Sequence, residues 1–256
     1  MANLRQKLLK GEQLIGTIIN VVDTLDIIKI FKGAGFDYVM VDNEHGSIEY
    51  SKIAQMILLG NEIDLGIIIR IPHAGRRDIL RYCDMGADGL MLPNCHNASI
   101  AKEMITHAKY TPQGNRGISM MRGHNRYIKV NNPLEYMKEQ NERTLMFVQI
   151  ESREGVKNVD AIMAVDGVDV AFIGPNDLSL DLGVMGQLDS PIYKEALAKV
   201  VKSAEKHGKF SGILTMTPEA MKPYIDMGMR ANLYSNEVSF LMASAAAVKE
   251  IRTFAK

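Results

Sequence analysis

The sequence predicts a (β/α)8 barrel that carries an active site at the carboxyl ends of its strands. Three observations lead to this fold class. Eight short apolar runs recur along the 256 residues, and the segments between them have helical spacing, an alternation typical of a parallel sheet covered by helices. Several of the runs end abruptly in a polar or charged residue. Barrels of this type commonly need about 250 residues, so we expect residues 1–256 to form one domain.

The apolar runs define the expected strands, because a strand buried on both faces reads as a continuous apolar segment. These strands are residues 14–19, 38–41, 66–71, 89–92, 145–151, 170–173, 210–214 and 231–234. Expected helices include residues 24–32, 51–59, 77–85, 155–163 and 193–207. Glycines in residues 33–37, 85–89 and 227–230 follow a helix, where a left-handed cap is expected. An extra C-terminal helix over residues 237–254 either closes the barrel or reaches a neighbouring subunit.

One connection interrupts this rhythm, from about residue 109 to residue 143. It contains no expected strand, and no acidic residue occurs between Glu103 and Glu135. Long excursions within a compact domain are usually functional or mobile. We expect this one to lie over the barrel mouth as a lid or to contact another subunit. Its basic residues, which favour an acidic substrate, are Lys109, Arg116, Arg122, Arg126 and Lys129.

The composition excludes several classes of function. Thirty lysines and arginines balance thirty acidic residues, so no overall field attracts nucleic acid or an anionic membrane. The amino terminus lacks a signal-peptide stretch, and no apolar run reaches the length of a membrane span. We therefore expect a cytoplasmic protein with two reduced cysteines and no nucleic-acid or membrane partner. The sequence has no nucleotide-binding glycine motif, and the expected strands contain no lysine for Schiff-base chemistry.

Two of the apolar runs are followed by carboxylates, Glu151 and Asp177. A carboxylate at the mouth of a barrel is partly desolvated, so it needs a cation or several donors to stay ionised. Oxygen ligands suit Mg²⁺ or Mn²⁺, with Co²⁺ or Zn²⁺ as alternatives. A bidentate 2-oxo acid would complete the coordination shell, and the ion would act as a Lewis acid. The alternative interpretation is that both residues only cap helices.

Other polar residues at strand ends complete the predicted site. Arg70 can donate to a carboxylate or a developing enolate oxygen, or it can simply pair with Asp42. His45 suits proton transfer, although a lone histidine is often structural. The turn from Gly174 to Asn176 leads into a helix, whose exposed amides favour an anionic group. Further polar residues at strand ends are Asn20, Glu44, Asn94, Gln149 and Ser235.

The chain resembles the HpcH/HpaI family of class II, pyruvate-dependent aldolases over nearly its full length. The motifs that carry the resemblance are residues 36–42 with Glu44-His45-Gly46, Arg70-Ile71-Pro72, residues 84–89, residues 110–117, Gln149-Ile150-Glu151 and residues 172–179. The resemblance implies a (β/α)8 TIM barrel of the phosphoenolpyruvate/pyruvate type, assembled as a homo-hexamer.

The resemblance also implies a role for each site residue. A divalent ion would bind Glu151 and Asp177. Pyruvate would contact Gln149, Arg70 and the amides around Gly174 and Asn176. His45, with Asp42 nearby, would assist proton transfer through metal-bound water. Asp84 would be supplied by a neighbouring subunit.

The function that these predictions favour is the reversible, metal-dependent aldol cleavage of a 4-hydroxy-2-oxo acid to pyruvate and an aldehyde. One alternative keeps the fold and uses a pyruvate enolate for decarboxylation or for addition to another electrophile. A second alternative is a non-enzymatic, anion-binding protein that uses the basic excursion.

Overall fold

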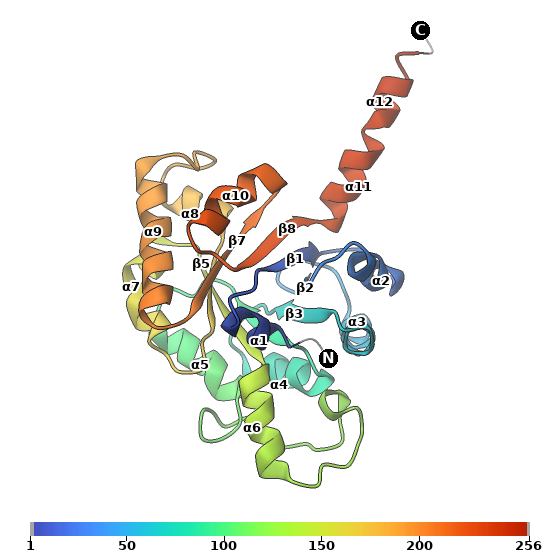
Figure 1. Cartoon of the computed structure of the whole chain (residues 1–256), viewed down its shortest axis with the longest axis vertical. Coiled ribbons are helices and arrows are strands. Elements are labelled where there is room, and N and C mark those ends of the chain that lie inside the picture. Colours follow the sequence, from blue (N-terminus) through green and yellow to red (C-terminus); the bar gives the residue numbers. More distant parts are fainter. Residues whose placement is uncertain (1–2, 255–256) are drawn as a thin grey trace.

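The eight strands close a parallel barrel in the order of the sequence (Figure 1), which confirms the predicted fold class. The computed structural model describes residues 3–254. Three strands have the predicted bounds, and the ends of the other five lie within two residues of the prediction. The strands are β1 (Leu14–Ile19), β2 (Tyr38–Asp42), β3 (Gly66–Arg70), β4 (Gly89–Leu92), β5 (Leu145–Ile150), β6 (Val170–Ile173), β7 (Phe210–Thr215) and β8 (Ala231–Asn236).

Helices precede, connect and follow the strands (Figure 1). They are α1 (Leu4–Leu9), α2 (Asp26–Gly33), α3 (Tyr50–Ile63), α4 (Arg76–Met85), α5 (Ala98–Ala108), α6 (Pro133–Arg143), α7 (Arg153–Met163), α8 (Pro175–Asp181), α9 (Pro191–Lys206), α10 (Pro218–Asp226), α11 (Glu237–Ala245) and α12 (Ala247–Ile251). The predicted glycine caps also form, because Gly35, Gly86 and Gly228 have φ angles of +94°, +96° and +100°. Such angles suit glycine, which has no Cβ to clash.

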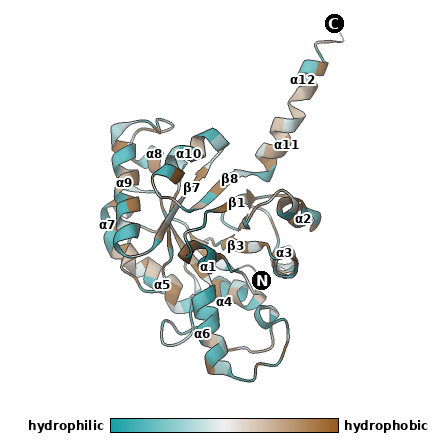
Figure 2. Ribbon diagram, viewed as in Figure 1, coloured by the Kyte–Doolittle hydropathy of each residue, from teal (hydrophilic) through white to brown (hydrophobic). Residues whose placement is uncertain are grey.

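The apolar strands are buried on both faces, and this double burial explains their continuous hydrophobic sequences. In β2, Tyr38 and Met40 belong to a cluster inside the barrel. Val39 and Val41 belong to the larger cluster between the strands and the helices. Figure 2 shows hydrophobic strands surrounded by helices with hydrophilic outer faces. Within residues 3–254, no helix is both long enough and apolar enough to cross a membrane.

The basic excursion lies away from the mouth, so the expectation of a lid is wrong for its own barrel. It follows the carboxyl end of α5, includes the unpredicted helix α6 and ends where β5 begins, at the amino-terminal face of the strands. Arg143 forms an ion pair of 3.1 Å with Asp88, just before β4. The fully buried Lys109 donates to the backbone oxygens of Asn141 and Thr144, both at 2.6 Å, and so caps the end of α6.

The C-terminal helices α11 and α12 extend away from the barrel (Figure 1). The first turns of α11 are attached, because Phe240 packs against the rings of Phe31 and Phe36. Beyond this point the C-terminal segment exposes large apolar side chains, namely Leu241, Met242, Val248, Ile251 and Phe254. Of the two predicted roles for this segment, closing its own barrel is therefore wrong.

We expect Gly212→Ala to destabilise the barrel strongly. A Cβ on Gly212 would lie 1.8 Å from the backbone oxygen of Ala231, so two adjacent strands would have to separate. Overpacking of this kind costs about 1–3 kcal/mol or more. Gly33→Ala is the matched control, because a Cβ there meets nothing within 4 Å. Urea denaturation should show a lower midpoint for Gly212→Ala alone, and equal midpoints for the two variants would contradict the prediction.

Candidate active site

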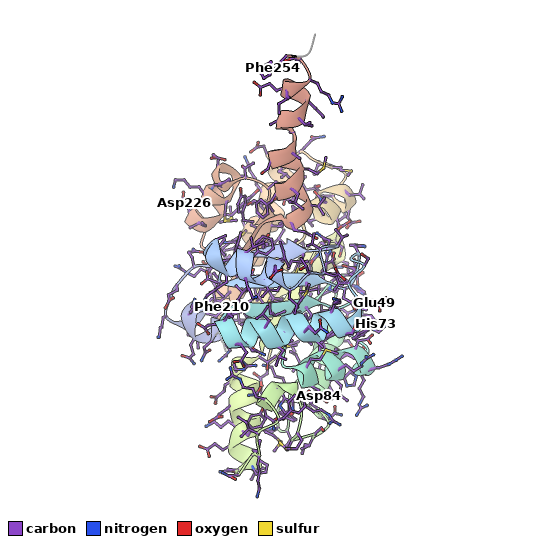
Figure 3. The ribbon with its side chains drawn as sticks, turned by 90° about the vertical axis from the view of Figure 1, so that its right-hand side faces the viewer. Glu49, His73, Asp84, Phe210, Asp226 and Phe254 are labelled. Carbon is purple, nitrogen blue, oxygen red and sulfur yellow. The ribbon has the colours of Figure 1, made fainter. Side chains whose placement is uncertain are left out.

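The candidate site lies at the mouth, the rim formed by the carboxyl ends of the strands. Figure 3 shows Glu49 and His73, which follow β2 and β3, at one end of the barrel, and Phe210, which begins β7, toward the other end. Parallel topology brings every strand end to the same rim. Residues from β2, β3, β5 and β6 therefore converge there, although they lie far apart in the sequence.

Asp42 and Arg70 form a two-point ion pair across neighbouring strands. Arg70 donates to the two carboxylate oxygens of Asp42 from Nε at 2.9 Å and from Nη2 at 2.6 Å. Burial favours the protonated form of Asp42, but the hydrogen bonds and charge of Arg70 outweigh it and lower the pKa of this carboxyl. The pair fixes the plane of the guanidinium group. Arg70 therefore does pair with Asp42, as one of its two predicted roles requires, but this pairing does not use all five of its N–H donors.

Glu44 and His45 follow on the loop after β2. Glu44 Oε2 lies 3.4 Å from Arg70 Nη1 and 3.8 Å from His45 Nε2. Burial raises the pKa of Glu44. The positive charge of Arg70 opposes this change, whereas the negative charges of Glu151 and Asp42 add to it. The His45 side chain is 72% exposed. It stands at the rim, free to meet a ligand or a water molecule.

Glu151 is held in place by a residue of β5 and by the loop that follows β4. Its Oε1 accepts a hydrogen bond of 2.7 Å from the backbone N–H of Asn94, and its Oε2 accepts one from Gln149 Nε2. Gly174 makes this packing possible, since a Cβ there would lie 2.3 Å from Glu151 Oε2. The carboxylate is therefore oriented before any ligand binds.

Glu151 and Asp177 are the two predicted carboxylates that could hold a divalent ion. Burial raises the pKa of Glu151, the negative charge of Asp177 raises it further, and the two hydrogen bonds oppose the change. The mouth gathers the acidic groups Asp42, Glu44, Glu151 and Asp177 around one guanidinium group, so its field favours a cation. Within residues 3–254, no cluster of three or more ligands forms. Two hard oxygen donors with open positions suit Mg²⁺, which usually keeps waters or substrate oxygens.

The turn before α8 differs in detail from the prediction. The Gly174 amide donates to the Ile150 oxygen at 3.3 Å, so it is already partly satisfied. Asn176 is exposed at the first turn of α8, beside Asp177. The structure thus brings Asn176 to the rim and leaves Gly174 mainly with the role of accommodating Glu151.

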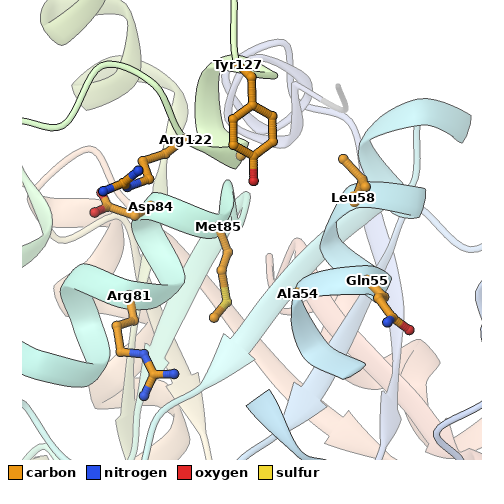
Figure 4. Close-up of a pocket in the computed structure, with 9 residues that line it drawn as sticks. Ala54, Gln55, Leu58, Arg81, Asp84, Met85, Arg122 and Tyr127 are labelled. Carbon is orange, nitrogen blue, oxygen red and sulfur yellow. The ribbon is translucent and has the colours of Figure 1, made fainter. Parts of the chain in front are cut away.

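Asp84 is the one predicted site residue that lies outside the mouth of its own barrel. It sits near the end of α4, where Arg116 donates to it at 2.7 Å. Figure 4 shows Asp84 beside Arg122 in a separate surface groove, with Met85 and Tyr127 nearby. This groove has a volume of about 390 Å³. None of the mouth residues lines it.

Two residues at the mouth have roles that the sequence does not predict. Asn94 was identified only as a polar residue, yet its backbone N–H holds Glu151 and its φ of +50° places it in the left-handed region. Glu237 was read only as part of a helix, but its buried carboxylate binds the loop after β1. A glutamate directly after a strand was the available signal for Glu237, whereas backbone donors leave no sequence signal.

The family described as HpcH/HpaI aldolase/citrate lyase matches residues 22–241. A hydroxypyruvate/pyruvate aldolase from Roseobacter denitrificans is 30% identical over 245 residues, which cover 95% of this chain and 94% of that protein. A 5-keto-4-deoxy-D-glucarate aldolase from Klebsiella pneumoniae is 32% identical over 195 residues, covering 76% of this chain and 75% of that protein.

A solved structure gives the same result. The HpcH/HpaI aldolase from Desulfitobacterium hafniense DCB-2 superposes with a TM-score of 0.94 at 32% sequence identity. The match covers 99% of this chain and 97% of the other chain. The similarity therefore extends over the barrel, the mouth and the C-terminal helices.

We expect Asp42→Asn to lower the free energy of unfolding by about 3 kcal/mol at pH 7, because it breaks a buried ion pair. Folding lowers the pKa of Asp42, so its contribution is complete above the unfolded value near 4 and is lost at lower pH. The difference from wild type should therefore shrink as the pH falls below about 5 in urea titrations. Asp226→Asn, at an exposed pair with Lys222, is the control. A difference that does not change with pH would refute the assignment.

Proposed function

The chain belongs to the HpcH/HpaI aldolase/citrate lyase family, and from this membership we propose that it reversibly cleaves a 4-hydroxy-2-oxo acid to pyruvate and an aldehyde. It is an enzyme of carbon–carbon bond cleavage, as its relatives named aldolases are. The alternative of a non-enzymatic binding protein is therefore set aside. A divalent ion, Mg²⁺ or Mn²⁺ with Co²⁺ as a substitute, is the proposed cofactor.

The observation that carries this proposal is the arrangement of charges across the mouth. On one side, Glu151 is oriented by Asn94 and Gln149, and its carboxylate interacts with the negative charge of Asp177. Arg70, held by Asp42, presents its remaining donors from β3. A 2-oxo acid has two adjacent oxygens for a cation and a keto oxygen for a guanidinium group, so it matches both sides.

Each residue has a proposed task in the reaction. A divalent ion on Glu151 and Asp177 would supply Lewis-acid stabilisation of negative charge on the 2-oxo acid. Arg70 and Gln149 would orient the keto group, and Asn176 at the start of α8 would bind the substrate carboxylate. Gly174 leaves the space in which Glu151 packs. These contacts select the 2-oxo acid half of the substrate.

His45 is the proposed proton carrier. In the cleavage direction the C4 hydroxyl loses its proton, the C3–C4 bond breaks, and its electron pair forms the enolate of pyruvate while C4 becomes the aldehyde. The exposed imidazole of His45 would accept that proton through a water molecule and return it in the synthetic direction. Asp42 accepts hydrogen bonds from the backbone of Glu44 and His45 and so holds this loop.

We propose that the chain forms a homo-oligomer, specifically a hexamer as the family resemblance implies. Such an assembly would use surfaces that are exposed in the single chain. The projecting helices expose Leu241 and Met242 at 60% and 67%. Asp84 lies outside its own mouth, beside the exposed Tyr127. We propose that the helices bind a second copy of the chain and that Asp84 acts at the mouth of a neighbouring subunit.

We expect complete removal of divalent metal to abolish pyruvate release from 4-hydroxy-2-oxo acids and added Mg²⁺ or Mn²⁺ to restore it. Glu151→Gln should lower kcat by roughly 100-fold or more, because it removes one of the two charged residues proposed to hold the ion that stabilises the enolate. A coupled lactate dehydrogenase assay measures the pyruvate formed. Glu154→Gln, an exposed change in the first turn of α7, is the control. Full activity in the chelated enzyme, or in Glu151→Gln, would rule out the proposal.

We also expect a double change of Leu241 and Met242 to aspartate to reduce the native mass, because charge on the projecting helices would prevent apolar contact with a second copy. Light scattering after size exclusion measures the mass. Lys249→Ala alters the same segment without removing apolar surface, so it should keep the wild-type assembly. If the double variant also kept that assembly, these helices would not be the contact.

A further inference from the structure

Glu237 is a buried carboxylate at the start of α11, with a relative exposure of 1%. All four of the hydrogen bonds that it accepts come from the loop after β1. Its Oε1 accepts from the backbone N–H groups of Asn20, Val21 and Val22 at 2.6, 2.7 and 3.3 Å, and its Oε2 accepts from Asn20 Nδ2 at 3.0 Å. Three successive amides that converge on one oxygen form an anion-binding nest. Here the anion is a side chain of the same chain.

The loop that Glu237 binds is itself locked to the loop that carries His45. The backbone oxygen of Asn20 accepts a hydrogen bond of 3.0 Å from Ser47 N–H. The two loops also pack closely at Gly46, where a side chain would not fit. A Cβ there would lie 2.7 Å from the backbone oxygen of Asn20 and 2.1 Å from that of Asp42. The two loops therefore cannot move independently without losing this contact.

His45 depends on its backbone for its position. Its side chain is 72% exposed, and among residues 3–254 its one polar side-chain partner is Glu44, whose Oε2 lies 3.8 Å from His45 Nε2. Its backbone is fixed on one side by Asp42, which accepts from His45 N–H at 3.2 Å. On the other side, the support comes through Gly46 and Ser47 from Asn20, and so from Glu237.

We propose that Glu237 is a positioning residue for the reaction, which acts by holding the loop of residues 20–22 against the His45 loop. This inference rests on the proposed function, since it assigns Glu237 to the proton step at the C4 oxygen and not to binding of the 2-oxo acid. Arg70, Glu151 and Asp177 belong to β3 and to the segments after β5 and β6, whereas the hydrogen bonds of Glu237 go to residues 20–22. The position of His45 therefore depends on the first residue of α11, the helix that projects from the barrel.

The test compares cleavage with enolate formation in Glu237→Ala. Cleavage of a 4-hydroxy-2-oxo acid includes the proton step, whereas exchange of pyruvate methyl protons with solvent deuterium, followed by NMR, reports enolate formation alone. We expect kcat for cleavage to fall by about 10- to 100-fold, as for a small displacement of a reacting group. The exchange rate and the KM for pyruvate should stay within about 3-fold of wild type. Glu219→Ala, an exposed glutamate in the first turn of α10, should leave both rates unchanged.

Two further variants separate positioning from a general structural effect. In a His45→Ala background, Glu237→Ala should lower cleavage by less than about 2-fold, because residues that act as a unit are not additive. Glu237→Gln should recover most of the activity, since its amide oxygen can still face the three backbone N–H groups. If Glu237→Ala does not fold, Glu237→Asp, which keeps the charge but shortens the side chain, carries the same comparison.

Equal losses of cleavage and exchange, or equal losses with and without His45, would overturn this inference. Wild-type rates of cleavage in Glu237→Ala would overturn it as well. A wild-type enzyme that neither cleaves 4-hydroxy-2-oxo acids nor exchanges pyruvate protons would instead refute the proposed function. The two failures are therefore distinguishable in one set of measurements.

Discussion

The burial of negative charge at the mouth is the constraint on which the site depends, because an ionised carboxylate out of water is costly unless it is paired. Asp42 is paired with Arg70, and Glu237 is satisfied by backbone amides. Glu151 has two hydrogen bonds but also faces the charge of Asp177, which raises its pKa. Of these three buried carboxylates, Glu151 therefore gains most from a cation. The same constraint explains why the mouth is ordered before any ligand binds.

The barrel and much of the mouth could be predicted because, in a parallel barrel, the place of a residue along its strand determines the rim at which it lies. Each strand is buried on both faces and so reads as an apolar run, and the residue that ends the run lies at a known rim. Asp42, Arg70 and Glu151 follow this rule. Their pairing could not be predicted, because a guanidinium group at a strand end has several acids within reach. From the sequence, Arg70 can pair with an acidic residue or bind a substrate, and the structure shows that Asp42 uses only some of its N–H donors.

The parts that were not predicted depend on tertiary contacts. Helix α6 has few apolar residues, and it is stabilised where Asn132 caps its first turn and Lys109 caps its end. Its position at the amino-terminal face follows from the direction of α5, which carries the chain away from the mouth. The role of Glu237 depends on backbone N–H groups of residues 20–22, which are the same in every sequence. Such contacts are visible only once the fold is known.

The basic excursion shows how a charge pattern in the sequence can mislead about a substrate. Its cations favoured an acidic aldehyde when the segment was expected to cover the mouth. In the structure Arg116 is paired with Asp84, Arg126 lies 3.5 Å from Glu62, and Lys109 caps a helix. All three lie at the face opposite the mouth of their own barrel, so they neither attract nor hold a ligand at the Glu151 of the same chain. The choice of aldehyde must therefore depend on the loops at the mouth and, in an oligomer, on the surface that a neighbouring copy brings to them.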